Sequence, residues 1–137
     1  MGTKIALGAI VTAAVLAAAA APTANAAPPR PSAAGQKVFE TNCAGCHGAL
    51  GTGVPNVFPP LVANPYVSGD AKRVIHTVKF GLTGKITVKG GTYNGTMPPW
   101  EGTLSDSQIA NVITYIRTTW KNKGTPVTVS QVRAVKK

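Results

Sequence analysis

Two cysteines and a histidine stand close enough in the chain to share one chemical task, in Cys43-Ala44-Gly45-Cys46-His47. This is the attachment sequence for haem of the c type, in which both thiols bind the porphyrin and the histidine coordinates the iron. The spacing suits that chemistry, because positions three apart lie about one helical turn apart and on the same side. We therefore predict one haem c attached through Cys43 and Cys46, with His47 as an iron ligand.

The same two thiols would also suit a disulfide, a redox-active pair or half of a zinc site. A thioredoxin-like pair is typical of a βαβ context, which the sequence does not show. A zinc site needs a second pair of ligands, and the chain has only two cysteines. A disulfide or a redox pair thus remains the main alternative to haem attachment.

Met97 is the second candidate for chemistry, because Pro98 and Pro99 follow it and restrict the local backbone. Such a turn can hold a thioether against iron, opposite His47. Iron with histidine and methionine ligands is closed to substrate and has a raised potential. A packed surface methionine is the alternative role for Met97. The other histidine, His76, is a possible axial ligand, but its helical position favours a solvent-facing role.

The predicted elements place these side chains around one centre. A helix capped by Ser32 runs to about Asn42, directly before the two thiols. Residues 48–65 are rich in Gly and Pro and predict a loop wrapped around the histidine side of the haem. A carbonyl near Pro59 is placed to accept the Nδ1–H of His47 and to fix its tautomer.

Three further segments follow this loop. A helix over residues 70–80 starts at Asp70, and residues 82–96 read as a small β-hairpin or a Gly-rich loop. Ser105 and Gln108 form a capping box for a long helix, whose apolar face includes Trp120 and which should end at Gly124. Ser130 should cap a short helix in the tail.

The start of the chain indicates export. Lys4 precedes an Ala/Val/Leu/Ile run, and Ala24-Asn25-Ala26 is a cleavage site, so residues 1–26 read as a signal peptide. An uncleaved membrane anchor is the alternative. Residues 27–31 would form a mobile lead-in. The expected location is the periplasm or another exported compartment.

A net charge of +10 favours acidic partners or anionic surfaces. Nucleic acid is the competing explanation of a basic chain, but no nucleic-acid motif is present. We therefore expect no nucleic-acid partner, and membrane contact only through partner proteins. Four lysines are the hypothetical docking surface, with simple solvation of the domain as an equal alternative: Lys72, Lys79, Lys85 and Lys89.

These motifs together resemble the bacterial single-haem class I c-type cytochromes, including those that serve periplasmic dehydrogenases, nitrite reductases and terminal oxidases. The resemblance covers residues 32–123 and leaves a basic tail over residues 124–137. Gly35 and Phe39 match the glycine–aromatic pair of the family's first helix, and Val112 and Tyr115 its partner pair on the last helix.

The resemblance implies an all-α fold of three main helices around one covalent haem. It also implies a proline carbonyl, here Pro59, on the ligand histidine. Arg73, Tyr93 and Trp100 stand where the family often places propionate or methionine-side contacts. The implied function is one-electron transfer rather than catalysis, with redox proteins such as dehydrogenases, reductases or oxidases as partners. The alternatives are a haem enzyme or gas sensor with an open sixth position, and a permanent cytochrome subunit of a dehydrogenase.

Overall fold

A computed structural model describes residues 1–2 and 32–137 of the chain. The helices in this part are α1 (Ala33–Asn42), α2 (Ala44–His47), α3 (Pro65–Ser68), α4 (Ala71–Phe80), α5 (Asp106–Thr118) and α6 (Val129–Ala134). Two strands, β1 (Leu82–Val88) and β2 (Gly91–Met97), form one antiparallel sheet. The predicted signal peptide and lead-in lie outside the described residues, apart from residues 1–2. Among the described helices, none has the length and apolar character needed to cross a membrane.

Side-chain caps start the three longest helices at the predicted positions. The Ser32 hydroxyl accepts a hydrogen bond from the Gly35 N–H at 3.0 Å. The Asp70 carboxylate accepts one from the Lys72 N–H at 2.9 Å. Ser105 heads a capping box that begins α5. These bonds satisfy amide groups that have no partner inside the helix, which is why the polar caps mark the starts.

The hydrophobic core lies where α1 packs against α5 and where α4 covers α5 from the other side. Gly35 makes the first contact possible, since a Cβ there would meet the Asn111 carbonyl oxygen and lie 2.8 Å from Tyr115 Cβ. The Phe39 and Tyr115 rings follow, with centroids 5.8 Å apart. The predicted crossing of the first and last long helices is therefore confirmed. The largest fully buried side chains are Phe39, Ile75, Ile109, Val112, Ile113 and Val132.

The hairpin makes the predicted all-α class wrong. β1 and β2 pair along their whole length, from Leu82 opposite Met97 to Val88 opposite Gly91. The turn between them has positive φ at Lys89 (50°) and at Gly90 (80°). Two positive-φ residues match the twist of the flanking strands, so this short connection stabilises a hairpin. One of the two structures expected for this segment, the hairpin, is therefore confirmed.

The end of α5 and the tail differ from the prediction. α5 ends at Thr118 rather than Gly124, because Thr119 is extended and both Trp120 (φ 49°) and Lys121 (φ 65°) are left-handed. Trp120 nevertheless packs on Phe39, with ring centroids 5.0 Å apart.

The tail helix α6 is capped by Thr128, not by Ser130. Thr128 and Gln131 form a second capping box, with the Gln131 N–H donating to the Thr128 hydroxyl at 3.2 Å. Thr128 and Gln131 have the same three-residue spacing as Ser105 and Gln108, the spacing of a capping box. Because Ser130 has no such partner three residues later, Thr128 is the better cap.

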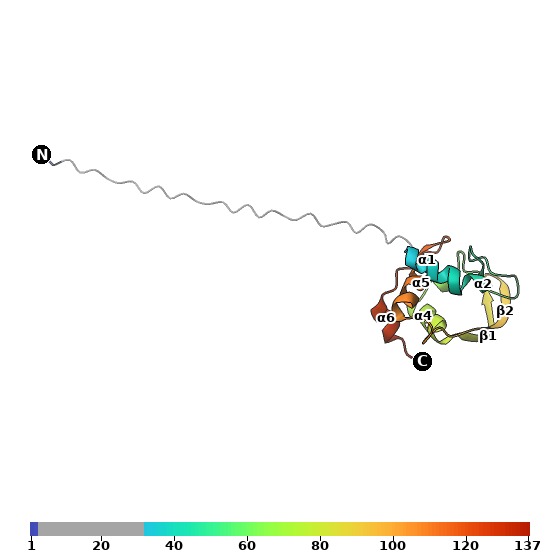
Figure 1. Cartoon of the computed structure of the whole chain (residues 1–137). Helices are drawn as coiled ribbons and strands as arrows, with labels where there is room; N and C mark the ends of the chain where they lie inside the picture. The colour runs from blue at the N-terminus through green and yellow to red at the C-terminus, as the bar shows by residue number, and fades with distance from the viewer. Residues whose placement is uncertain (3–31) are drawn as a thin grey trace.

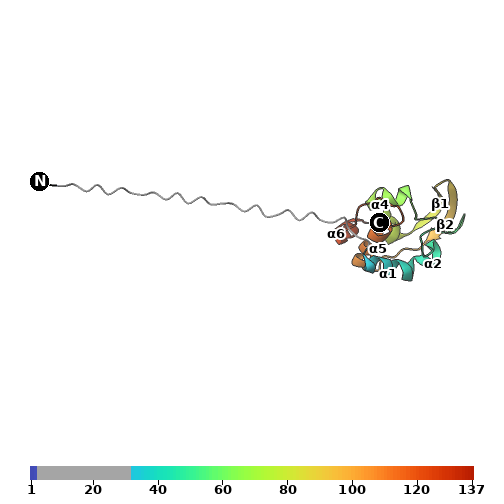
Figure 2. The same ribbon diagram turned by 90° about the horizontal axis from the view of Figure 1, so that it is seen from above.

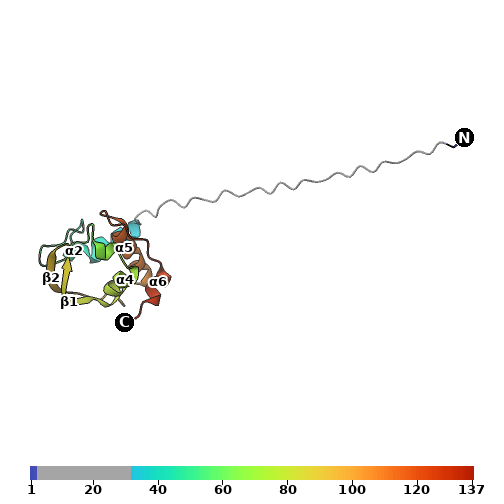
Figure 3. The ribbon, with the colours of Figure 1, turned by 180° about the vertical axis from the view of Figure 1, so that it is seen from behind.

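The hairpin and α6 occupy opposite ends of the folded domain. Figure 1 shows β1 and β2 beside α2 at one end and α6 beside α4 and α5 at the other. The same separation appears from above in Figure 2 and from behind in Figure 3. The hairpin and α6 thus pack at opposite ends of the group of helices formed by α1, α4 and α5.

Candidate functional site

The helix α2 carries the two thiols and the histidine in a fixed order. Cys43 ends α1 and begins α2, and its N–H donates to the Phe39 carbonyl at 2.8 Å. The His47 N–H donates to the Cys43 carbonyl at 3.0 Å, which closes one helical turn between them. Both cysteines are free, with Cys43 half-buried and Cys46 exposed. The helical turn therefore supplies the spacing that covalent haem attachment requires.

His47 is held as a neutral imidazole with one free nitrogen. Its Nδ1 lies 3.0 Å from the Pro59 carbonyl oxygen, and because a carbonyl only accepts, Nδ1 must carry the proton. The ring is buried, and burial lowers the pKa of His47 despite the opposing effect of the Pro59 carbonyl. The Nε2 lone pair is then available for a metal. The contact expected between His47 and Pro59 is present in the fold.

The Cys43 thiol is not an activated nucleophile in this chain. Burial, and to a smaller extent the charge of Cys46, raises the pKa of Cys43 to about 11. Redox-active cysteines have lowered pKa values, because the thiolate is the reactive form. The environment of Cys43 thus does not favour a redox role for this thiol.

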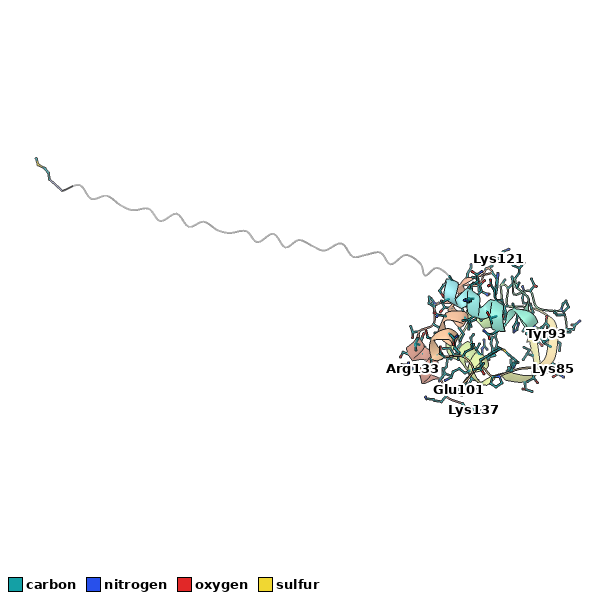
Figure 4. The ribbon with its side chains drawn as sticks, in the orientation of Figure 1. Lys85, Tyr93, Glu101, Lys121, Arg133 and Lys137 are labelled. Carbon is teal, nitrogen blue, oxygen red and sulfur yellow. The ribbon has the colours of Figure 1, made fainter. Side chains whose placement is uncertain are left out.

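One cavity brings together seven of the eight predicted site residues. Those that line it are Cys43, Cys46, His47, Pro59, Tyr93, Met97 and Trp100. Most of the remaining wall is apolar, with side chains such as Val78 of α4, Ile86 of β1 and Leu104 from the segment before α5. Figure 4 labels Tyr93 on β2, at the end of the domain that also holds α2. An apolar cavity with two free thiols, a neutral imidazole and a thioether in its wall fits a covalent haem.

The position of Met97 depends on close backbone packing. Met97 is the last residue of β2 and pairs with Leu82 across the hairpin. Gly81, with φ 79°, passes so near that a Cβ there would lie 2.6 Å from the Met97 carbonyl oxygen. After the two prolines, the Trp100 N–H bonds to the Val78 carbonyl at 3.1 Å. Both sides of the methionine turn are thus fastened to the end of α4.

Three predicted residues lie away from this cavity or in an unexpected state. Arg73 is not in the cavity wall, and its guanidinium lies 4.1 Å from the centre of the Tyr66 ring. His76 is exposed and packs beside Phe80, with ring centroids 5.0 Å apart. Lys79 is 3% exposed, so it is buried and cannot belong to a docking surface.

Among the cavity residues that sequence reasoning missed are two at the start of α3. Asn64 and Tyr66 both line the cavity. Asn64 caps α3, with its Oδ1 accepting the Tyr66 N–H at 2.8 Å, and Pro65 follows as the first helical residue. An Asn-Pro pair is a recognised helix start and would have located this turn.

Comparisons with known proteins show the family of this chain. The family model for cytochrome c matches residues 32–120. Cytochrome c-552 of Thermus thermophilus is 37% identical over 111 residues, which cover 74% of this chain and 83% of that protein.

Two further relatives are subunits of larger enzymes. The cytochrome c subunit of a quinone alcohol dehydrogenase from Gluconobacter oxydans is 38% identical, over 71% of this chain and 20% of that subunit. The cbb3-type cytochrome c oxidase subunit CcoP of Cereibacter sphaeroides is 32% identical, over 62% of this chain and 26% of the subunit. The family model spans more than half of the chain, so this protein belongs to the cytochrome c family, whose members bind haem c covalently and transfer electrons.

Proposed function

We propose that this protein is an exported one-electron carrier with a single haem c, attached through Cys43 and Cys46 and ligated by His47 and Met97. The observation that carries the proposal is the cavity whose wall contains all four side chains. Bound there, haem c supplies one reversible electron through its iron. The remaining roles belong to the protein, which binds the group, orients its ligands and limits access of water.

Each side chain has a distinct task in this arrangement. Cys43 and Cys46, at α2, would hold the haem by covalent bonds, so that the haem cannot dissociate. His47 presents Nε2 because Pro59 keeps the proton on Nδ1. Met97 would offer its thioether from the end of β2, in the wall of the cavity that the two thiols also line. With His47 and Met97 both holding the iron, no coordination position would remain for a substrate, which would favour electron transfer over substrate chemistry.

A visible spectrum of the purified protein in both oxidation states tests the proposal. The protein should be made in a host that attaches haem c, and the colour should stay with the polypeptide after denaturation. The oxidised protein should show the deep-red band of a methionine–iron bond. Met97→Ala should keep the covalent haem and lose this band. A colourless wild-type protein would overturn the proposal, and ready binding of carbon monoxide by the wild type would favour the enzyme or sensor alternative.

A permanent subunit of a dehydrogenase or oxidase is the second candidate. The observation in its favour is that two relatives are cytochrome subunits, although this chain spans only 20% and 26% of them. Gel filtration with periplasmic and membrane extracts of the native cell separates the two functions. A free carrier should elute at the size of one small domain, and a subunit should elute with its enzyme.

A further inference from the structure

Asn122 is a buried polar side chain outside the cavity wall, with a relative exposure of 8%. Its Oδ1 accepts the Asn64 N–H at 2.9 Å and the Ser68 hydroxyl at 3.3 Å. Its Nδ2 donates to the Leu61 carbonyl at 2.8 Å and to the Ile116 carbonyl at 2.7 Å. One amide therefore ties the end of α5 to the loop that precedes α3.

That loop continues directly to the carbonyl that holds His47. Asn64 Nδ2 donates to the Pro60 carbonyl at 2.7 Å, and the Leu61 N–H donates to the Gly51 carbonyl at 2.7 Å. Pro59 directly precedes Pro60 in the chain, and its carbonyl oxygen accepts the His47 Nδ1–H. Within residues 60–64, the two asparagine side chains thus bond to the Pro60 carbonyl, the Leu61 carbonyl and the Asn64 N–H.

The backbone on both sides of this contact is strained. Ala63 has φ 45°, and Trp120 and Lys121 have φ 49° and 65°. These left-handed conformations are uncommon for residues with a Cβ and persist where the surroundings determine them. The Ala63 N–H donates to the Trp120 carbonyl at 2.9 Å, so the two strained turns face each other. Asn122 follows them immediately and bonds across the same junction.

We propose that Asn122 is a positioning residue for His47. It holds residues 60–64 so that the Pro59 carbonyl stays on the His47 Nδ1–H, and through that bond it sets the orientation and basicity of the imidazole. This inference rests on the proposed role of His47 as an iron ligand. Because a firm bond at Nδ1 makes the imidazole a stronger donor, it favours the oxidised protein, and its loss should raise the reduction potential.

The test compares holoproteins that differ at Asn122. In the reduced wild type, NMR should show a His47 Nδ1–H that exchanges slowly with solvent. Asn122→Ala should speed this exchange about tenfold or more, because the loop opens more often, and should raise the reduction potential. Asn122→Asp keeps an oxygen for the Asn64 N–H but cannot donate to the Leu61 carbonyl, so it should shift both readouts in the same direction.

A matched control separates positioning from general loss of stability. Val132→Ala removes a fully buried side chain from α6, far along the chain from residues 59–64. It should lower the unfolding midpoint while leaving the His47 exchange rate and the potential unchanged. The inference is overturned if Asn122→Ala changes neither readout, or if Val132→Ala changes both equally.

Failure of this inference is distinguishable from failure of the proposed function. A wild-type protein without covalent haem would remove the proposed function itself. A wild-type protein with haem, beside an Asn122 variant with an unchanged His47 signal, would remove only the positioning role. If Asn122→Ala does not fold, the comparison of Asn122→Asp with the wild type decides the matter.

Discussion

Lys79 shows how one buried charge can hold three parts of a small protein together. Its ammonium donates to the Val132 carbonyl at 3.2 Å and to the Val135 carbonyl at 2.8 Å. It also pairs with the Glu101 carboxylate at 3.3 Å, while the Glu101 side chain remains half exposed. These bonds join α4 to the tail helix and to the segment after the methionine turn. A buried lysine is tolerated because its ammonium has three oxygen partners: two carbonyls and one carboxylate.

We expect Lys79→Ala to destabilise the holoprotein by about 2–4 kcal/mol, because two carbonyls lose a charge-assisted bond and a cavity forms. Urea unfolding, followed by the visible spectrum and by circular dichroism, measures the change. Lys85→Ala is the matched control, since Lys85 is exposed on β1 and should change stability by less than about 0.5 kcal/mol. Equal midpoints for the two variants would contradict the structural role of Lys79.

At the scale of elements, the contact between α1 and α5 depends on the absence of a side chain at Gly35. We expect Gly35→Ala to cost about 1–3 kcal/mol or more, because the new Cβ collides with the Asn111 carbonyl and with Tyr115. Gly45→Ala, where a Cβ meets no atom within 4 Å, should have little effect. Thermal unfolding of both holoproteins measures the difference. An unchanged melting temperature for Gly35→Ala would show that α1 and α5 can move apart without loss of stability.

The helix α6 is an integral part of the domain. Val127, Val132 and Val135 are buried, and Thr114 on α5 exchanges two hydrogen bonds with the Val127 backbone, at 2.9 and 3.2 Å. The tail thus covers α4 and α5 at the end opposite the hairpin (Figure 3).

Truncation after Gly124 should destabilise the holoprotein by about 2–4 kcal/mol, because three buried valines are lost. The loss is smaller than their full burial free energy, because the intact protein spends part of that free energy on the conformational entropy of an ordered tail. Removal of Lys136 and Lys137 alone is the control, because both are exposed. Urea unfolding of the two shortened proteins is the measurement. If the long and the short truncation have the same midpoint, the tail contributes nothing to the core.

Across the whole molecule, the cofactor cavity receives side chains from α1, α2, α4, α5 and the hairpin. A small domain gains little stability from its own core, so a haem that fills this cavity should add apolar contacts to each of these walls. We expect protein made without haem attachment to unfold at a lower urea concentration than the holoprotein and to lose near-ultraviolet circular dichroism. Far-ultraviolet circular dichroism gives the remaining helix content. Superimposable unfolding curves for the two forms would contradict this role of the haem.

The positive charge is distributed over several sides of the molecule. Figure 4 shows Lys85 at the hairpin, Lys121 after α5 and Arg133 on α6, at separate edges of the domain. We expect electron transfer to an acidic redox partner to slow as salt rises, because screening weakens long-range attraction beyond about 8 Å at physiological ionic strength. Stopped-flow rates over a salt series measure this effect. Lys85→Glu, next to the cavity end, should reduce the low-salt rate more than Lys121→Glu, and a rate independent of salt would exclude electrostatic docking.

The sequence by itself determined the parts of this protein that depend on neighbours within a few residues. The two thiols and His47, the caps at Ser32, Asp70 and Ser105, and the prolines after Met97 act over one turn or less. Their signals are therefore complete in a short stretch of chain. For residues 82–96, local residue preferences left a hairpin and a Gly-rich loop open, and the all-α expectation from the family resemblance did not include the hairpin.

Only the tertiary structure decided the features that depend on distant partners. Asn122 bonds to residues 58 and 61 positions away, and Lys79 bonds to residues 53 and 56 positions away. The Arg73 guanidinium lies over the Tyr66 ring instead of in the cavity wall. The end of α5 at Thr118 comes with the left-handed Trp120 and Lys121, and Asn122 then bonds to the Ile116 carbonyl. Nothing in a short segment identifies which polar group will be buried. A charge or an amide is stable in the interior only when folding brings its acceptors from elsewhere in the chain, so burial and partners are decided together.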